Sequence, residues 1–229
     1  RITPDADITG NVEYLPLGNA KQWAQTAAKH ADGYAKKDMS EIIKAQKYDS
    51  ETTAKEFVKY CESLYIDVIP YVAMFGHQYR LLQSDKYKHL CELENHTPYD
   101  HYWRERMLHH SIDVSSPESF ELIKSLIDQY VPNFTSDKFN ICCDETFDLG
   151  KGKNQGKNPS ELYTEFVKQI VDYVRSKGKI PMMWGDVIEH IEPLGDNIVF
   201  LNWGYSPNEK PDKIYNLAKA GKTQFVCPG

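Results

Sequence analysis

The residues of this sequence best suited to chemistry are two adjacent carboxylic acids, Asp144 and Glu145. They directly follow a short apolar run, Phe139 to Cys143, within the stretch KFNICCDETFDLG of residues 138–150. Burying one carboxyl group beside another raises the pKa of one of them, so that the two can act as proton donor and charged partner. The pair therefore predicts acid and base chemistry, and an acidic pair that only caps the next helix is the alternative.

Aromatic and polar side chains follow three further apolar runs that are typical of buried strands. They are His77 after residues 65–75, Trp184 and Asp186 after residues 180–183, and Trp203 and Tyr205 after residues 198–202. The carboxyl ends of barrel strands meet at one mouth, where these side chains are expected to join the acidic pair. Indole rings stack on the apolar faces of sugars while carboxylates bind hydroxyl groups. The set predicts a carbohydrate site, although a structural hydrogen bond is the alternative for His77.

The elements that position these residues alternate along the chain. Helical repeats of apolar residues occupy residues 19–34, 50–64, 116–131, 159–177 and 211–220, and strand-like runs occupy residues 65–75, 139–143, 180–183, 198–202 and 224–227. Such alternation predicts βαβ units with a parallel sheet. A (β/α)8 TIM barrel typically needs about 250 residues, and this chain has 229. We expect one α/β barrel domain over residues 1–229, cut short at both ends, with residues 1–49 fitting the pattern poorly.

Composition excludes several classes of partner. The 27 basic and 33 acidic residues give a net charge of -6 without a basic cluster, so nucleic acid is not an expected partner. No apolar run approaches the roughly 20 residues of a membrane span. The five cysteines form no CxxC pair, which predicts reduced thiols and favours a cytoplasmic location. The pattern leaves the oligomeric state open.

The segment of residues 78–116 is rich in histidine and aromatic residues but has no helical or strand period. It lacks a His-x-x-x-His pair with an adjacent acid, so we predict no metal site there. A long segment of this kind inside a compact domain is usually functional, and a loop that covers the substrate fits the composition better.

At these residues the sequence resembles the family 20 glycoside hydrolases, the β-N-acetylhexosaminidases. CDET at residues 143–146 is similar to the Asp-Glu hallmark at the end of the family's fourth strand, and Gly76-His77 to its Gly-His after the third. Trp184 in MMWGD and Trp203 in LNWGY resemble the tryptophans after the next two strands. The resemblance covers roughly residues 50–229.

The resemblance implies an exo-acting enzyme that hydrolyses terminal β-linked N-acetylglucosamine or N-acetylgalactosamine with retention of configuration. The substrate's 2-acetamido group would be the nucleophile, which is an exception to the two-carboxylate scheme. Glu145 would be the acid and base, and Asp144 would orient the acetamido group. Trp184 and Trp203 would wall its pocket. His77, Asp186 and Tyr205 would assist, with no metal or organic cofactor.

The sequence departs from the family pattern at two of these strands. Ala73 stands where the family has an aspartate, and Cys143 where a glycine is common.

Three other functions remain open. They are a glycosidase that uses carboxylates from two strands, such as Glu145 and Asp186, a glycan-binding remnant without catalysis, and a metal-dependent hydrolase built on the histidine-rich segment.

Overall fold

The computed structural model describes residues 7, 9–33, 37–93, 110–185, 192–204 and 212–228. The chain divides into two compact units, Arg1–Leu64 and Tyr65–Gly229. Each unit is described by itself.

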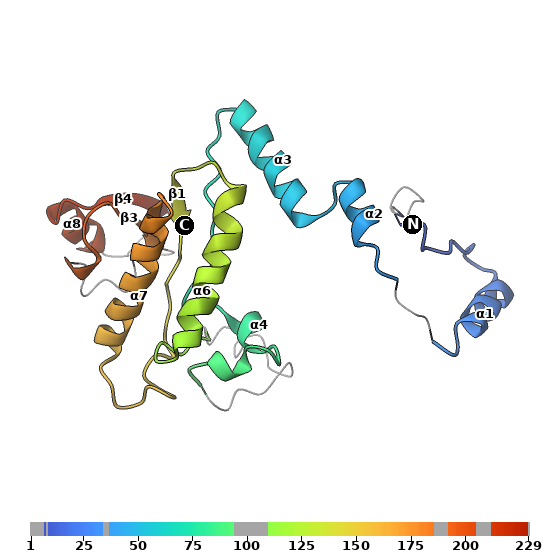
Figure 1. Ribbon diagram of the computed structural model, residues 1–229, viewed down its shortest axis with the longest axis horizontal. Coiled ribbons are helices and arrows are strands. Elements are labelled where there is room, and N and C mark those ends of the chain that lie inside the picture. The colour runs from blue at the N-terminus through green and yellow to red at the C-terminus, as the bar shows by residue number, and fades with distance from the viewer. Residues whose placement is uncertain are drawn as a thin grey trace. The chain divides into compact units, whose positions relative to one another are not determined.

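The smaller unit is built from helices. They are α1 (Ala20–Lys29), α2 (Ser40–Ala45) and α3 (Ser50–Ser63) (Figure 1). The cap of α3 is Asp49, whose side chain accepts a hydrogen bond from the backbone N–H of Thr52 at 2.9 Å. Asp49 has an extended backbone, as a capping residue requires, and it directly precedes the helix predicted over residues 50–64.

The larger unit contains a parallel sheet, as the alternation of elements predicts. Its strands are β1 (Lys138–Asn140), β2 (Ile180–Trp184), β3 (Val199–Gly204) and β4 (Thr223–Pro228), in the spatial order β1-β2-β3-β4. The predicted strand of residues 65–75 pairs with β1 through one bridge, between Tyr71 and Asn140. Pro70 has no N–H, and its carbonyl instead accepts the N–H of Asn140 at 2.9 Å.

Helices cover one face of this sheet. The long helices α6 (Pro117–Tyr130) and α7 (Pro159–Ser176) lie side by side, and α8 (Asp212–Lys219) lies between β3 and β4 in the chain (Figure 1). Short elements are α4 (Tyr79–Leu82), η2 (Lys88–Leu90), η3 (Val131–Asn133) and η4 (Glu192–Leu194). The apolar residues that repeat at three and four in α6 and α7 form the buried stripe that sequence patterning predicts.

Alternation along the strands separates two apolar clusters. Phe139, Met183 and Phe200 belong to the main core together with residues of α6 and α7. Met182, Val199 and Leu201 form a second cluster on the opposite face, and Trp184 packs against it. Since neighbouring side chains on a strand point to opposite faces, β2 and β3 each contribute to both clusters.

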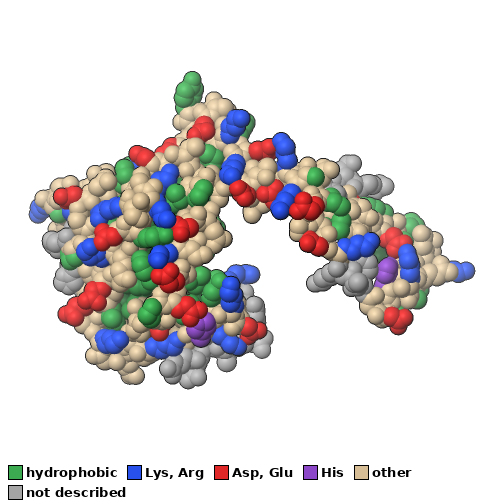
Figure 2. Space-filling model, in the orientation of Figure 1, with side chains coloured by type: hydrophobic (Ala, Val, Ile, Leu, Met, Phe, Trp, Pro, Cys, Tyr) green, Lys and Arg blue, Asp and Glu red, His purple; other side chains and the backbone are tan. Residues whose placement is uncertain are grey.

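The surface of the larger unit carries mixed charge. Basic and acidic side chains are interspersed on the face shown in Figure 2. No helix in the part of the chain that the structure describes is both long and apolar enough to cross a membrane. The five cysteines, all within the described ranges, form no disulfide bond, and Cys61, Cys91, Cys142 and Cys143 are buried.

Candidate active site

The two acids lie in a tight bend at the end of β1. Cys142, Cys143 and Glu145 have positive φ angles of 61°, 60° and 49°. This conformation is unfavourable for residues with a side chain, costing on the order of 1–3 kcal/mol each. The bend ends the predicted strand of residues 139–143 at Asn140, and it explains why glycine suits the position of Cys143.

Hydrogen bonds from neighbouring elements hold this bend in place. The N–H of Trp184 donates to the carbonyl of Cys142 at 3.0 Å, and the hydroxyl of Tyr163 on α7 donates to the carbonyl of Cys143 at 2.7 Å. The N–H of Cys142 donates to Oδ1 of Asn140 at 2.9 Å. The surrounding structure thus fixes a backbone that would otherwise relax, and the direction of both acids is set by it.

Gly76 allows the loop that carries His77 to approach the acids. A Cβ atom at Gly76 would lie 2.4 Å from the carbonyl oxygen of Asp144, a distance that no real Cβ contact has. Any side chain would therefore separate the two loops. The Gly-His dipeptide combines a residue that permits close contact with one that carries a titratable ring.

His77 lies between the two carboxylates. Its Nε2 is 3.1 Å from Oδ2 of Asp144 and 3.2 Å from Oε2 of Glu145. The side chains of His77, Asp144 and Glu145 are 33%, 13% and 23% exposed, so the group is reachable but mostly enclosed. The structure thus brings together three of the predicted site residues from two strand ends.

One carboxylate oxygen of Asp144 is buried without a hydrogen-bond donor among the described residues. Its Oδ2 faces His77, whereas its Oδ1 is buried and accepts no hydrogen bond from any residue that the structure describes. An unsatisfied buried acceptor costs about 1–3 kcal/mol. Asp49 and Asp148 each have a buried oxygen of the same kind, so this feature alone does not identify a binding group.

The two predicted tryptophans share a face of the sheet. Trp184 ends β2 and pairs in register with Leu201, and Trp203 lies two residues further along β3. Residues two apart in a strand point to the same side, so both partly buried indoles lie on the face away from α6 and α7. The predicted Asp186 and Tyr205 lie outside the described residues.

Three side chains near the acids, those of Tyr163, Tyr71 and Cys142, were not predicted from sequence to act at the site. Tyr163 falls on the apolar stripe of α7 and gives no sign there of its hydrogen bond to the bend. Burial, with the nearby Cys142 thiol and the charge of Asp144, raises the pKa of Tyr71 to about 12. Burial and the charge of Asp144 also raise the pKa of Cys142. The side chains of Tyr71 and Cys142 are therefore neutral near pH 7, and Cys142 is not a reactive thiolate.

The acids and the histidine also have the donor set of a metal site. One ligand atom each from His77, Asp144 and Glu145 lies within 4.8 Å of the others, which makes this the one such group in the described ranges. An imidazole and two carboxylates suit zinc, but they equally suit a proton donor, its charged neighbour and a shared hydrogen-bonding ring.

Comparisons with known proteins bear on the family and the fold of this chain. The model of the glycosyl hydrolase family 20 catalytic domain matches residues 19–229. Lacto-N-biosidase from Bifidobacterium bifidum is 28% identical over 197 residues, which cover 78% of this chain and 17% of that protein. Hexosaminidase D from Bos taurus is 21% identical over 189 residues, which cover 78% of this chain and 51% of that protein.

A solved structure shows the same fold. The chitobiase of Flavobacterium johnsoniae superimposes with a TM-score of 0.64 at 20% identity, covering 78% of this chain and 28% of that one. The predicted (β/α)8 TIM-barrel fold is thus confirmed, and this chain corresponds to part of that domain. The chain spans about half, or less, of the curated relatives that it matches. Because the family model matches almost the whole sequence, the chain belongs to glycosyl hydrolase family 20.

Proposed function

We propose that this chain carries the catalytic acids of an exo-acting β-N-acetylhexosaminidase. The observation that carries the proposal is the placement of Asp144 and Glu145 at a strand end, both within 3.2 Å of Nε2 of His77. Membership of family 20 and the hexosaminidase and chitobiase names of similar proteins support it. The substrate would be a glycan that ends in β-linked N-acetylglucosamine or N-acetylgalactosamine.

The oxygen of Asp144 that has no donor suggests how the substrate takes part in its own hydrolysis. When the groups that bury Oδ1 of Asp144 move aside on binding, it accepts the N–H of the 2-acetamido group and turns the acetamido carbonyl oxygen towards the anomeric carbon. That oxygen forms a bond to the anomeric carbon as the glycosidic bond breaks. Glu145 donates a proton to the leaving oxygen, which keeps the electron pair of the broken bond.

The second half of the reaction reverses these roles. Glu145, now ionised, takes a proton from a water molecule that attacks the anomeric carbon, and the bond to the acetamido oxygen breaks. Two inversions give net retention, without the covalent carboxylate intermediate of other retaining glycosidases. His77 contacts both acids and keeps their oxygens in place.

Other predicted residues have binding roles in this proposal. Trp184 and Trp203 wall the acetamido pocket, because their rings lie on the same sheet face. Asp186 and Tyr205 contact sugar hydroxyls. Neither a metal nor an organic cofactor takes part in any step.

The test is hydrolysis of an aryl N-acetyl-β-glucosaminide by the full-length protein, with the anomer of the first product followed by NMR. We expect a β product, competitive inhibition by the thiazoline analogue of the intermediate, and loss of turnover in Glu145→Gln with the analogue still bound. An α product would indicate an inverting enzyme that uses carboxylates of different strands. Binding of the analogue without turnover by the wild type would indicate a glycan-binding remnant.

A second candidate function is that of a lacto-N-biosidase, the activity that the name of the Bifidobacterium bifidum relative states. That relative is 28% identical to this chain, compared with 21% for hexosaminidase D. Aryl glycosides of N-acetylglucosamine and of lacto-N-biose separate the candidates, because an exo-acting hexosaminidase prefers the former at least tenfold in kcat/KM.

The free thiols bear on location. None of the five cysteines, all of which lie in the described ranges, forms a disulfide bond. Unpaired buried cysteines are typical of reducing compartments, and we propose a cytoplasmic location. Cell fractionation tests it, and recovery of the protein in the culture medium would contradict it.

A further inference from the structure

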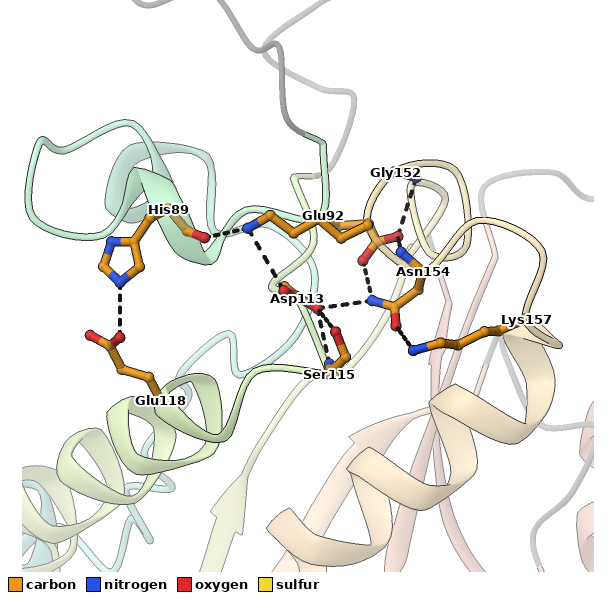
Figure 3. Close-up of polar contacts among 9 residues, drawn as sticks. His89, Glu92, Asp113, Ser115, Glu118, Gly152, Asn154 and Lys157 are labelled. Carbon is orange, nitrogen blue, oxygen red and sulfur yellow. Dashed lines mark hydrogen bonds and ion pairs between the residues drawn. The ribbon is translucent and has the colours of Figure 1, made fainter.

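A buried polar cluster joins the two loops that carry the site residues. The first loop, residues 76–93, contains His77 near its start, and the second loop, residues 144–158, begins with the two acids. Glu92 on the first loop accepts hydrogen bonds from the second: Oε1 from the N–H groups of Gly152 at 3.2 Å and Asn154 at 3.0 Å, and Oε2 from Nδ2 of Asn154 at 2.6 Å (Figure 3). We call this cluster, completed by Asp113, the loop clamp.

The loop clamp is buried and its carboxylate oxygens are paired. Glu92 and Asn154 are fully buried, and Asp113 is 5% exposed. Nδ2 of Asn154 also donates to Oδ1 of Asp113 at 2.9 Å, and Oδ1 of Asn154 accepts from Nζ of Lys157 at 2.8 Å (Figure 3). Lys153 adds an ion pair to Asp113 and donates to the carbonyl of His89. A buried network with satisfied partners is rigid, because each group has only one favourable arrangement.

The contact is close enough to require a glycine. A Cβ atom at Gly152 would lie 1.9 Å from the carbonyl oxygen of Glu92, and the N–H of Lys153 donates to that carbonyl at 2.9 Å. Gly76 has the same relation to Asp144 at the other end of the loops. The two loops are therefore in contact both beside the acids and at the loop clamp.

Hydrogen bonds connect the loop clamp to both sides of the site. On the His77 side, the N–H of Glu92 donates to Ser111, and the N–H of Ile112 donates to the carbonyl of Phe75 at 3.1 Å. On the acid side, tight turns run from Glu145 to Gly152, beginning with the N–H of Phe147 donating to the carbonyl of Glu145 at 2.9 Å. These hydrogen bonds connect the loop clamp to Phe75, two residues before His77, and to Glu145.

We propose that Glu92 and Asn154 are positioning residues that keep His77 in contact with Glu145. The inference rests on the proposed function of Glu145. A contact of 3.2 Å tolerates little movement, and a misplacement of about 1 Å far from the reacting atoms lowers turnover by about 100-fold. Neither residue touches the substrate, so their loss lowers kcat more than it changes KM.

The experiment is a double-mutant cycle of Asn154→Ala and His77→Ala in the full-length protein. We expect Asn154→Ala alone to lower kcat about 10- to 100-fold with KM within a factor of three, and to have less than a threefold effect when His77 is already alanine. Glu118→Gln is the matched control, since it breaks the exposed ion pair with His89 beside the loop clamp and should leave kcat unchanged. Equal losses of kcat in both backgrounds overturn the proposal.

Two further measurements keep the result decisive. If Asn154→Ala does not fold, Glu92→Gln replaces it, because glutamine keeps the shape and puts one amide N–H against Nδ2 of Asn154. Hydrogen exchange of residues 76–82 and 144–158 should become at least tenfold faster in the variant that folds. Unchanged exchange overturns the positioning role whether or not the wild type is active, whereas absent wild-type turnover with accelerated exchange overturns only the proposed function.

Discussion

The acids of the candidate site and the acids of the loop clamp satisfy their oxygens differently. Asp144 has a buried oxygen without a partner among the described residues, whereas each carboxylate oxygen of Glu92 and Asp113 has a hydrogen bond or an ion pair. The two carboxylates of the loop clamp use all their acceptors within the protein. In the proposed mechanism Asp144 instead uses its remaining acceptor for the substrate, at a cost that the rest of the fold must offset.

The two regions also differ in backbone strain, which is greater at the acids than at the loop clamp. The bend at the acids has non-glycine residues with positive φ, including Cys142 and Cys143. The loop clamp has Gly152 where the two loops touch, and its other residues Glu92, Asp113 and Asn154 are not among those with positive φ. Strain is concentrated where chemistry is proposed, and the contacts that hold it lie outside.

The largest expected effect is that of Glu145→Gln. Glutamine keeps the size of the side chain but cannot donate a carboxylic proton, so kcat should fall about 1,000-fold with KM little changed. Steady-state kinetics on the aryl substrate measure this, with Glu161→Gln on the exposed first turn of α7 as the control. A loss below tenfold would show that another group supplies the proton.

Asp144→Asn tests the role of the buried Oδ1 atom of Asp144, which has no donor among the described residues. The amide is neutral and cannot balance the charge that develops on the acetamido nitrogen, so we expect kcat to fall about 100-fold. The preference for the N-acetyl substrate over the matching aryl β-glucoside should shrink together with kcat. An unchanged preference would mean that Oδ1 of Asp144 does not face the acetamido group.

Gly152→Ala should disrupt the loop clamp by steric overlap. The new methyl group would overlap the carbonyl of Glu92, so the free energy of unfolding should fall by about 3 kcal/mol. Gly156→Ala in the same loop is the control, because its Cβ would have nothing within 4 Å and its φ of +84° costs only about 1 kcal/mol. Urea denaturation compares the two, and equal losses would deny the close contact.

The parallel sheet and the two long helices are predictable from sequence because period and punctuation determine them. The helices expected over residues 116–131 and 159–177 are found as α6 and α7, each with a proline in its first turn. The bend is not predictable, since residues 139–143 have the composition of a strand and only tertiary hydrogen bonds turn them. The loop clamp is missed for a related reason: Glu92 and Asn154 stand 62 positions apart in segments that look like solvated loops.

Asp148 extends the comparison to a carboxyl group whose pairing is incomplete. It is 6% exposed, and burial together with the charge of Glu92 raises its pKa to about 6 from 3.8. The folded state therefore binds this proton more tightly than the unfolded state, and its contribution to stability is complete below pH 4 and lost as pH rises through 6.

Asp148→Asn should remove this pH dependence. We expect the free energy of unfolding to increase by up to about 2 kcal/mol at pH 7.5 and to stay unchanged near pH 4. Denaturation at both pH values measures the difference, and Asp172→Asn on the exposed side of α7 is the control. A variant that is less stable at pH 7.5 would show that the Asp148 carboxylate is itself well paired.

Chelation should have the smallest effect, and it tests the one feature that the candidate site shares with metal enzymes. The ligand atoms of His77, Asp144 and Glu145 converge, but the proposed reaction needs only a proton and the acetamido oxygen. Prolonged dialysis against EDTA should therefore leave kcat within a factor of two. If activity were lost and zinc alone restored it, the site would work as a metal centre. Glu145 would then be a ligand, and the difference between its oxygens and those of the loop clamp would reflect metal binding.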